Sequence, residues 1–321
     1  MNFIDKDFGL RVILENSFQT IYTIDKENSE SRMILYHLYP GVDIILSDFK
    51  ERYTWAGEWR LKGRIYQISY NCSGVYQAQI RKNEFCYASP GNLVILNSCK
   101  KSLDSKMTTD DLRGFSILLF PELFDQARTE EWIKQFDLDM NYFIELLPET
   151  DTAKVFPCGE GILRVAEEIY KLLYNHEMGI LKLKLLEFFH MIIKEDIRIE
   201  NRKRVFSGEQ IEKTKMIKEL IEMDLSKHYT IQELCWRHEL STTIFKECFK
   251  QMFQYPPYEF LRIARMNRAG EYLKKSEMSI IDIGRLLGYE NPSNFTRTFK
   301  EIYGVLPRQY RNSSYKEKCL K

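Results

Sequence analysis

The stretch Ser276–Arg311, SEMSIIDIGRLLGYENPSNFTRTFKEIYGVLPRQYR, contains two short helical patterns separated by a turn. Ser279 followed by Asp282 is typical of a helix N-cap with its acidic partner. Gly288 then favours a left-handed helix end, and Pro292 fits the first position of a second helix. The spacing therefore predicts two helices joined by a tight turn.

The second of these helices has an apolar face and a separate polar, basic face. Phe295, Phe299 and Ile302 recur at helical spacing on the apolar side. The candidate DNA-binding residues of this helix are Ser293, Asn294, Thr296, Arg297 and Lys300. Such a stripe is typical of a helix-turn-helix that reads a major groove. An ordinary helical hairpin with a solvated charged face would give the same local pattern.

An internal repeat favours the helix-turn-helix interpretation. A shift of fifty residues superimposes four identical pairs, which are Phe245/Phe295, Phe249/Phe299, Lys250/Lys300 and Pro257/Pro307. In this first copy Thr230 and Glu233 predict a capping box, and Ser241 is expected to cap the second helix. The candidate DNA-binding residues of this copy are Thr242, Thr243, Lys246 and Lys250.

The segment between the two copies is predicted to be one helix. Pro257–Lys274 has no internal proline, and its only glycine is Gly270. A helix of roughly eighteen residues spans about 27 Å. Successive major grooves recur about 34 Å apart, so a rigid spacer of this length favours two recognition helices reading adjacent grooves.

The C-terminal part of the chain resembles the DNA-binding domain of the AraC/XylS family of bacterial transcription regulators. The matching residues are Ala269, Leu273, Ser276, Ile280, Ile283, Leu287, Gly288, Tyr289, Ser293, Phe295, Arg297, Phe299, Lys300, Gly304, Pro307, Tyr310 and Arg311. Gly284, Leu306, Gln254 and His238-Glu239 depart from the family pattern and affect the expected turn geometry rather than the fold. The resemblance implies a regulator, most often an activator, that binds double-stranded promoter DNA and works with RNA polymerase.

Length and charge divide the chain. A chain of 321 residues is expected to contain two or three domains. From residue 262 onward, thirteen Lys and Arg face six Asp and Glu, although the whole chain carries a net charge of +1. A basic end with the repeat suits a phosphate-binding surface, and a solvated charge excess is the alternative. The expected boundaries are a sensor domain over 1–150, a helical dimerisation region and linker over 151–204, and a DNA-binding domain over 205–321.

The first part of the chain is predicted to be rich in strands. Arg64–Tyr70 and Val75–Ile80 alternate on either side of a turn and predict a hairpin. Ser89–Asn92 predicts a turn, and Phe115–Phe120 another strand. Short strands at this spacing favour a small barrel or sandwich. The family resemblance implies a cupin-like β-barrel that senses an effector, which makes the expected fold class α+β with a C-terminal all-α domain of two helix-turn-helix units.

Two apolar stripes at helical spacing follow the strands. They are Ile162, Val165, Ala166, Ile169, Leu172 and Leu173, and then Leu181, Leu185, Phe188, Phe189 and Ile192. The resemblance implies that such helices mediate dimerisation, so a homodimer is expected. Packing of both helices on the strand-rich domain is the alternative.

Aromatic residues are dense in the strand-rich part and are candidates for an effector pocket. The candidate ligand-binding residues are Trp55, Trp59, Tyr66, Tyr70 and Tyr76. Ordinary core packing is the alternative for each of them. The main hypothesis is a regulator controlled by a small-molecule effector. The competing hypothesis is a regulator gated by a protein partner, without a small-molecule pocket.

Enzyme and metal chemistry find little support in the sequence. The strand-rich part has a single histidine, His37, and the chain lacks a glycine-rich phosphate loop, a GxSxG elbow and an HExxH motif. No enzyme activity, metal or cofactor is expected. Seven cysteines without a CxxC pair favour a reducing compartment. With no secretory signal pattern and no long apolar run, we expect a cytoplasmic protein without a membrane partner.

Overall fold

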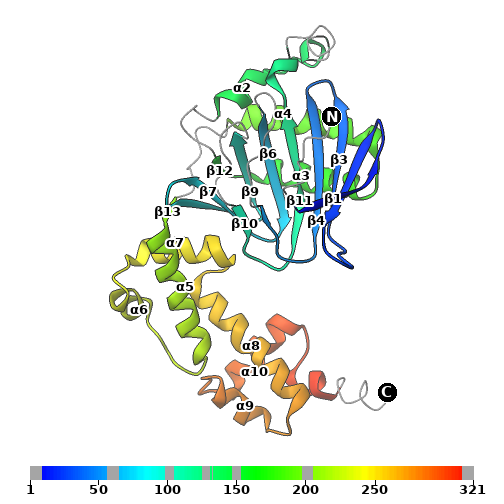
Figure 1. The fold of residues 1–321 in the computed structure, drawn as a ribbon. Coiled ribbons are helices and arrows are strands. Elements are labelled where there is room, and N and C mark those ends of the chain that lie inside the picture. Colours follow the sequence, from blue (N-terminus) through cyan, green and yellow to red (C-terminus); the bar gives the residue numbers. More distant parts are fainter. Residues whose placement is uncertain are drawn as a thin grey trace. The chain divides into compact units, whose positions relative to one another are not determined.

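The computed structural model describes residues 9–55, 65–97, 105–124, 131, 133–146, 153–196 and 205–312. The chain divides into two compact units, residues 1–207 and 208–321. The first holds sheets and helices, and the second consists of helices (Figure 1).

An eight-stranded antiparallel sheet forms the framework of the N-terminal unit. In pairing order its strands are β1 (Leu10–Glu15), β2 (Gln19–Ile24), β3 (Arg32–Tyr39), β4 (Val42–Phe49), β11 (Leu112–Leu119), β6 (Tyr66–Ser73), β9 (Asn92–Asn97) and β12 (Ala153–Pro157). Most residues of the central strand β4 are buried, whichever face of the sheet they point to. A strand that is covered on both faces is expected to show this pattern.

A smaller sheet of five strands accompanies it. In pairing order these are β13 (Phe206–Ser207), β8 (Glu84–Ala88), β7 (Tyr76–Arg81), β10 (Ser105–Met107) and β5 (Thr54–Trp55). Cys86 of this sheet packs in one cluster with Val94 of the large sheet. Met107 likewise shares a cluster with Leu35 and Ile45. The small sheet therefore covers part of one face of the large one.

The strand order differs from the expected barrel. Neither order returns to its first strand, so the strands that the structure describes form two open sheets around a shared core. The mixed α and β composition is confirmed, whereas the cupin-like closure stays a prediction.

The predicted hairpin between Arg64–Tyr70 and Val75–Ile80 is wrong. Both segments contain strands, but β6 pairs with β11 and β9, while β7 pairs with β8 and β10. Gly74 between them has φ +84°, and a Cβ there would collide with the carbonyl oxygen of Asp111. The turn signal therefore marks a close backbone crossing at which the chain leaves one sheet for the other.

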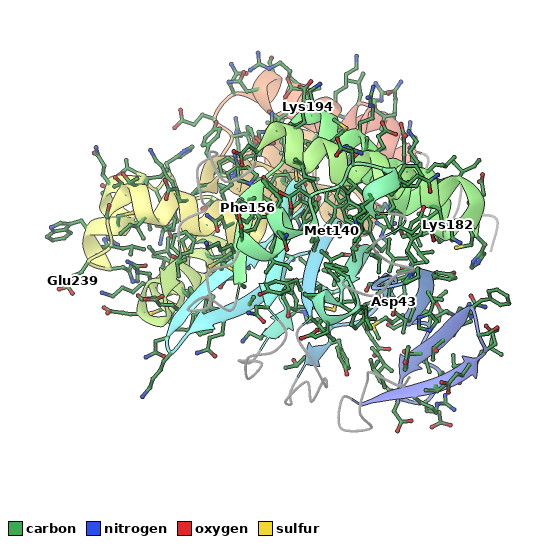
Figure 2. The ribbon with its side chains drawn as sticks, turned by 90° about the horizontal axis from the view of Figure 1, so that it is seen from above. Asp43, Met140, Phe156, Lys182, Lys194 and Glu239 are labelled. Carbon is green, nitrogen blue, oxygen red and sulfur yellow. The ribbon has the colours of Figure 1, made fainter. Side chains whose placement is uncertain are left out.

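Helices cover the other face of the large sheet. They are α2 (Met140–Glu145), α3 (Glu160–Tyr174) and α4 (Met178–Glu195), and a short 3-10 helix, η2 (Pro121–Leu123), follows β11. Phe188 of α4 meets Phe115 of β11 edge-to-face, with ring centroids 5.9 Å apart. Met140 and Phe156, labelled in Figure 2, belong to the same core. The apolar stripes of α3 and α4 thus pack on their own unit, as the alternative to dimerisation helices expected.

The C-terminal unit is made of six helices among the residues described. They are α5 (Gly208–Met223), α6 (Ile231–Arg237), α7 (Thr242–Phe253), α8 (Pro257–Lys275), α9 (Ile280–Leu286) and α10 (Pro292–Tyr303). The predicted spacer is α8, and it separates the pair α6–α7 from the pair α9–α10 (Figure 1). Each pair has its own apolar cluster.

Candidate nucleic-acid interface

The caps of the second helix pair define where its reading helix begins. The Ser279 hydroxyl accepts a hydrogen bond from the Asp282 backbone N–H at 3.1 Å, which starts α9. Gly288 follows with φ +80°. The Asn291 side chain then accepts from the Ser293 N–H at 2.8 Å, with Pro292 in the first turn of α10. The predicted helix-turn-helix is therefore present, and its second helix exposes its N-terminal turn.

The first pair repeats this arrangement with different turn residues. Thr230 and Glu233 form the predicted capping box of α6. Ser241 occupies the N-cap position of α7, but its side chain makes no capping hydrogen bond. Glu239 and Gln254 take positive φ angles of +49° and +71°. These are two of the sites where the sequence departs from the family pattern, so the fold is kept at the cost of backbone strain. Figure 2 labels Glu239 at the outer edge of its unit.

Equivalent aromatic residues hold both reading helices in place. Phe245 and Phe249 of α7, and Phe295 and Phe299 of α10, are fully buried. Each copy also has a triad of rings in mutual contact, Phe249–Phe253–Phe260 in the first and Phe299–Tyr303–Tyr310 in the second. The fifty-residue repeat thus corresponds to a repeated core.

The candidate DNA-binding residues lie on the faces of α7 and α10 opposite these cores. The exposed ones are Thr243, Lys246, Lys250, Ser293, Asn294, Arg297 and Lys300, and the half-buried ones are Thr242 and Thr296. The Arg297 side chain is 72% exposed. Each reading helix therefore presents hydroxyl, amide and basic groups together, which are the groups that contact base edges and phosphates.

Arg297 belongs to a small polar network that the sequence analysis missed. Its guanidinium donates to the Asn294 side chain at 3.4 Å and lies 4.0 Å from Glu301. Glu301 is also held by Arg262 of α8 at 2.9 Å. This network holds the Arg297 head group near the N-terminal turn of α10.

A second missed residue, Arg265, links the two helix pairs. Its Nε donates to the Leu225 carbonyl at 2.7 Å and its Nη2 to the Lys227 carbonyl at 3.1 Å. Its guanidinium also lies 5.6 Å from the Tyr289 ring centroid. Burial lowers the pKa of Arg265 from its ordinary value, although an arginine keeps its charge in proteins.

Arg265 therefore ties the loop before α6 to the turn between α9 and α10. His228 of the same loop lies 3.1 Å from the Gly288 carbonyl and donates to it through Nε2. A sequence signal existed, because Arg265 stands four and eight residues before the buried Ala269 and Leu273 on one face of α8.

The aromatic candidates for a ligand site are dispersed. Tyr66 and Tyr70 are buried in the core beneath the helices, where Tyr70 packs on Phe115 at 5.8 Å between centroids. Burial raises the pKa of Tyr70 above its ordinary value. Tyr76 is half-buried in other clusters. Trp59 and the side chain of Trp55 lie outside the described residues. The described part thus brings two of the five together, inside a packed core.

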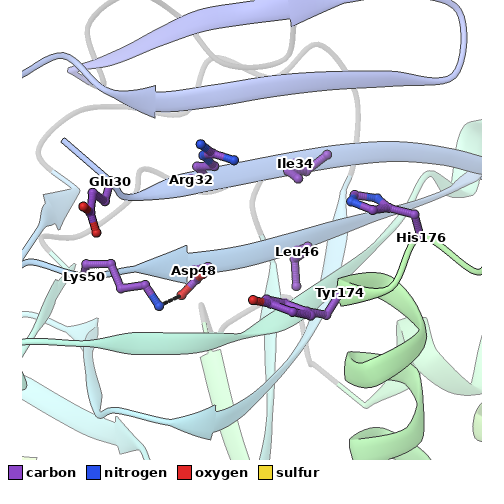
Figure 3. A pocket seen from close by; sticks show the side chains of 8 residues that line it. All are labelled: Glu30, Arg32, Ile34, Leu46, Asp48, Lys50, Tyr174 and His176. Carbon is purple, nitrogen blue, oxygen red and sulfur yellow. Dashed lines mark ion pairs between the residues drawn. The ribbon is translucent and has the colours of Figure 1, made fainter. Parts of the chain in front are cut away.

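A cavity of about 510 Å³ lies elsewhere in the N-terminal unit (Figure 3). It is lined by Glu30, Arg32, Ile34, Leu46, Asp48, Lys50, Tyr174 and His176. These come from β3, β4, the residues beside them, the end of α3 and the α3–α4 connection. The sequence analysis assigned no role to any of them.

Among the residues that the structure describes, no group of three His, Cys, Asp or Glu side chains is arranged to hold a metal ion. His37 pairs with Asp43 at 3.0 Å; burial raises the Asp43 pKa, and this hydrogen bond opposes the rise. No helix in the same residues has both the length and the apolar character needed to cross a bilayer.

Residues 234–313, which lie within the C-terminal unit, match a family described as a helix-turn-helix domain. The F1 operon positive regulatory protein of Yersinia pestis is 35% identical over 86 residues, 27% of this chain and 29% of the relative. The HTH-type transcriptional activator RhaR of Yersinia pseudotuberculosis serotype O:1b is 26% identical over 127 residues, 40% of this chain and 43% of the relative. The matched regions therefore span less than half of these curated relatives.

Among solved structures, ToxT from Vibrio cholerae O395 aligns with 84% of this chain and 97% of its own, at 14% identity and a TM-score of 0.30. The family match covers most of both helix pairs and all of α8, the elements in which the repeat and its caps were found. Residues 234–313 thus match a helix-turn-helix domain, and part of the chain is similar to curated helix-turn-helix regulators.

Proposed function

We propose that this chain is a sequence-specific DNA-binding transcription regulator. The observation that carries the proposal is the repeated helix pair, in which α7 and α10 each expose a polar and basic face above an aromatic core. Residues 205–321 would bind promoter DNA as one module that reads two adjacent major grooves. The names of the two curated relatives, a positive regulator and an activator, support an activating role. In that role the chain would act together with RNA polymerase.

We further propose that the N-terminal unit controls this module. Residues 1–150 would sense an effector and 151–204 would mediate homodimer formation and the link to the DNA-binding domain. An effector acts only if it binds the states of the protein with different affinity. The cavity supports small-molecule control. The filled core around Tyr66 and Tyr70 is what the alternative, gating by a protein partner, expects.

Arg297→Ala and Lys300→Ala are expected to affect DNA binding differently. A binding site is first selected from random duplexes with the full chain, and affinity is then measured on all single-base variants of it. Arg297→Ala should lose discrimination of about 1–3 kcal/mol at one base pair, because an arginine fork reads a base edge. Lys300→Ala should weaken every sequence alike and lower the dependence on salt by about one phosphate contact.

Lys171→Ala, on an exposed site of α3, is the matched control and should change neither quantity. Uniform losses for both test variants would contradict the assignment of Arg297 as a reader. If selection with the full chain enriches no DNA sequence, the proposed function is contradicted.

A further inference from the structure

The cavity has an apolar floor and an aromatic wall. Ile34 and Leu46 are cross-strand partners on the face of the large sheet that the helices cover, and both belong to its core. Tyr174 and His176, from the end of α3 and the connection to α4, line the cavity beside them (Figure 3). The Tyr174 side chain is 60% exposed. A ligand with an apolar portion would therefore find buried carbon below it and a ring at its side.

A hydrogen bond to Tyr36 positions His176 at this wall. Its Nδ1 lies 2.8 Å from the Tyr36 hydroxyl, and the two rings meet edge-to-face. Its backbone takes a φ of +60°, a conformation that few residues other than glycine adopt. Because Nδ1 is engaged by Tyr36, Nε2 is the ring nitrogen left to contact a ligand.

The other end of the cavity carries four charged side chains with an unusual pairing. Lys50 binds Asp48 at 2.7 Å (Figure 3). Arg32 of β3 lies directly opposite Asp48 of β4, but the Asp48 carboxylate forms its ion pair with Lys50 rather than with Arg32. Among the residues that the structure describes, the side chains of Arg32 and Glu30 have neither an ion pair nor a hydrogen bond. The Glu30 carboxylate and the Arg32 guanidinium are therefore free to bind a ligand in the cavity.

The spacing of these two groups indicates what they bind together. Glu30 lies two residues before Arg32, the first residue of β3, and both side chains line the cavity. Two residues span at most roughly 7 Å of backbone. The amino and carboxyl ends of an extended dipeptide are separated by about the same distance. A ligand with only an acid would leave Glu30 facing it, a ligand with only an amine would leave Arg32 facing it, and an apolar ligand would desolvate both.

We propose that this cavity binds a zwitterionic dipeptide with an apolar side chain. Arg32 holds its carboxylate, Glu30 holds its ammonium group, and its side chain lies over Ile34 and Leu46 beside Tyr174. This names the effector class of the regulator, and its regulatory meaning rests on the function proposed above.

The test is calorimetric titration of the full chain with L-leucyl-L-phenylalanine. The same peptide with an acetylated amino end, and the same peptide with an amidated carboxyl end, serve as matched probes that each lack one charge. The free dipeptide should bind, and each modified probe should bind about tenfold more weakly or worse, since each loses a charged hydrogen bond. Equal affinity for all three, or no heat at millimolar peptide, overturns the proposal.

Two substitutions locate the site. Glu30→Gln should remove the preference for the free over the acetylated peptide, and Arg32→Gln the preference for the free over the amidated one. Both side chains are exposed, so folding is expected to persist, and circular dichroism checks it. Lys171→Gln is the control and should keep both preferences. If both preferences survive in the Glu30 and Arg32 variants, the peptide binds elsewhere and the proposal fails.

DNA binding is measured on the same preparations by fluorescence anisotropy with the selected duplex. Intact DNA binding without peptide binding overturns this inference alone. Peptide binding without DNA binding overturns the proposed function and leaves the cavity as a dipeptide site.

Discussion

Arg265→Met is expected to lower the free energy of unfolding of the C-terminal unit by about 2–4 kcal/mol. Methionine keeps much of the side-chain volume but donates no hydrogen bond. Arg265 donates hydrogen bonds to the carbonyls of Leu225 and Lys227 at 2.7 and 3.1 Å, and the substitution removes both donors. Arg265 itself is only 7% exposed. A fully buried acceptor left unsatisfied costs about 1–3 kcal/mol. These two hydrogen bonds are part-buried, so water that reaches the loop offsets part of this cost.

Arg268→Ala on the same helix is the matched control. Arg268 is exposed and pairs with Glu271 on the surface at 3.1 Å, so its loss should cost less than about 1 kcal/mol. Both are measured by urea unfolding followed through the helical signal, with the transitions of the two units fitted separately because a chain of two units need not unfold in one step. Equal and small effects of the two substitutions would show that Arg265 is not needed to hold the loop.

Arg265→Met should also change how the protein reads DNA. The loop it fixes precedes α6, and the turn it touches precedes α10, so it helps to set the placement of one reading helix relative to the other. On a duplex with both half-sites, affinity should fall further than on a duplex with one half-site. Loss in equal proportion on both duplexes would indicate that stability, rather than placement, explains the effect.

The caps and the repeat of the C-terminal unit could be predicted because they are local. A capping box, a positive-φ glycine and a proline in the first turn depend on neighbours within a few residues, as Thr230, Glu233, Gly288 and Pro292 illustrate. The core phenylalanines followed from helical spacing alone. These signals located α6, α7, α9 and α10, because little outside each segment was needed to decide them.

The sheets and the cavity could not be predicted in the same way. Gly74 reads as a hairpin turn until its close approach to Asp111, far along the chain, is known. Glu30 and Arg32 read as surface charges, since nothing local places Tyr174 and His176 beside them. Tyr66 and Tyr70 suit a ligand pocket and a core equally well by composition, and only the packing of α4 decides between these.

Gly288→Ala is expected to be the most damaging change of glycine in the C-terminal unit. Gly288 has φ +80°, and a Cβ there would collide with the Ser226 carbonyl oxygen and lie 3.0 Å from Nη2 of Arg265. Gly304, at the end of α10, has φ +74°, and a Cβ added there would have no other atom within 4 Å. Gly304→Ala therefore isolates the backbone strain, about 1–2 kcal/mol, whereas Gly288→Ala should add displacement of the loop and cost about 3 kcal/mol or more.

Thermal unfolding of both variants checks this ranking, and a larger loss for Gly304→Ala would contradict it. The combination of Gly288→Ala with Arg265→Met tests whether the two residues serve one contact. Since alanine at 288 already displaces the loop that Arg265 holds, the double variant should lose less than the sum of the single losses. Additive losses would mean that the loop stays in place when Gly288 is replaced, and that the two helix pairs are joined by something other than this contact.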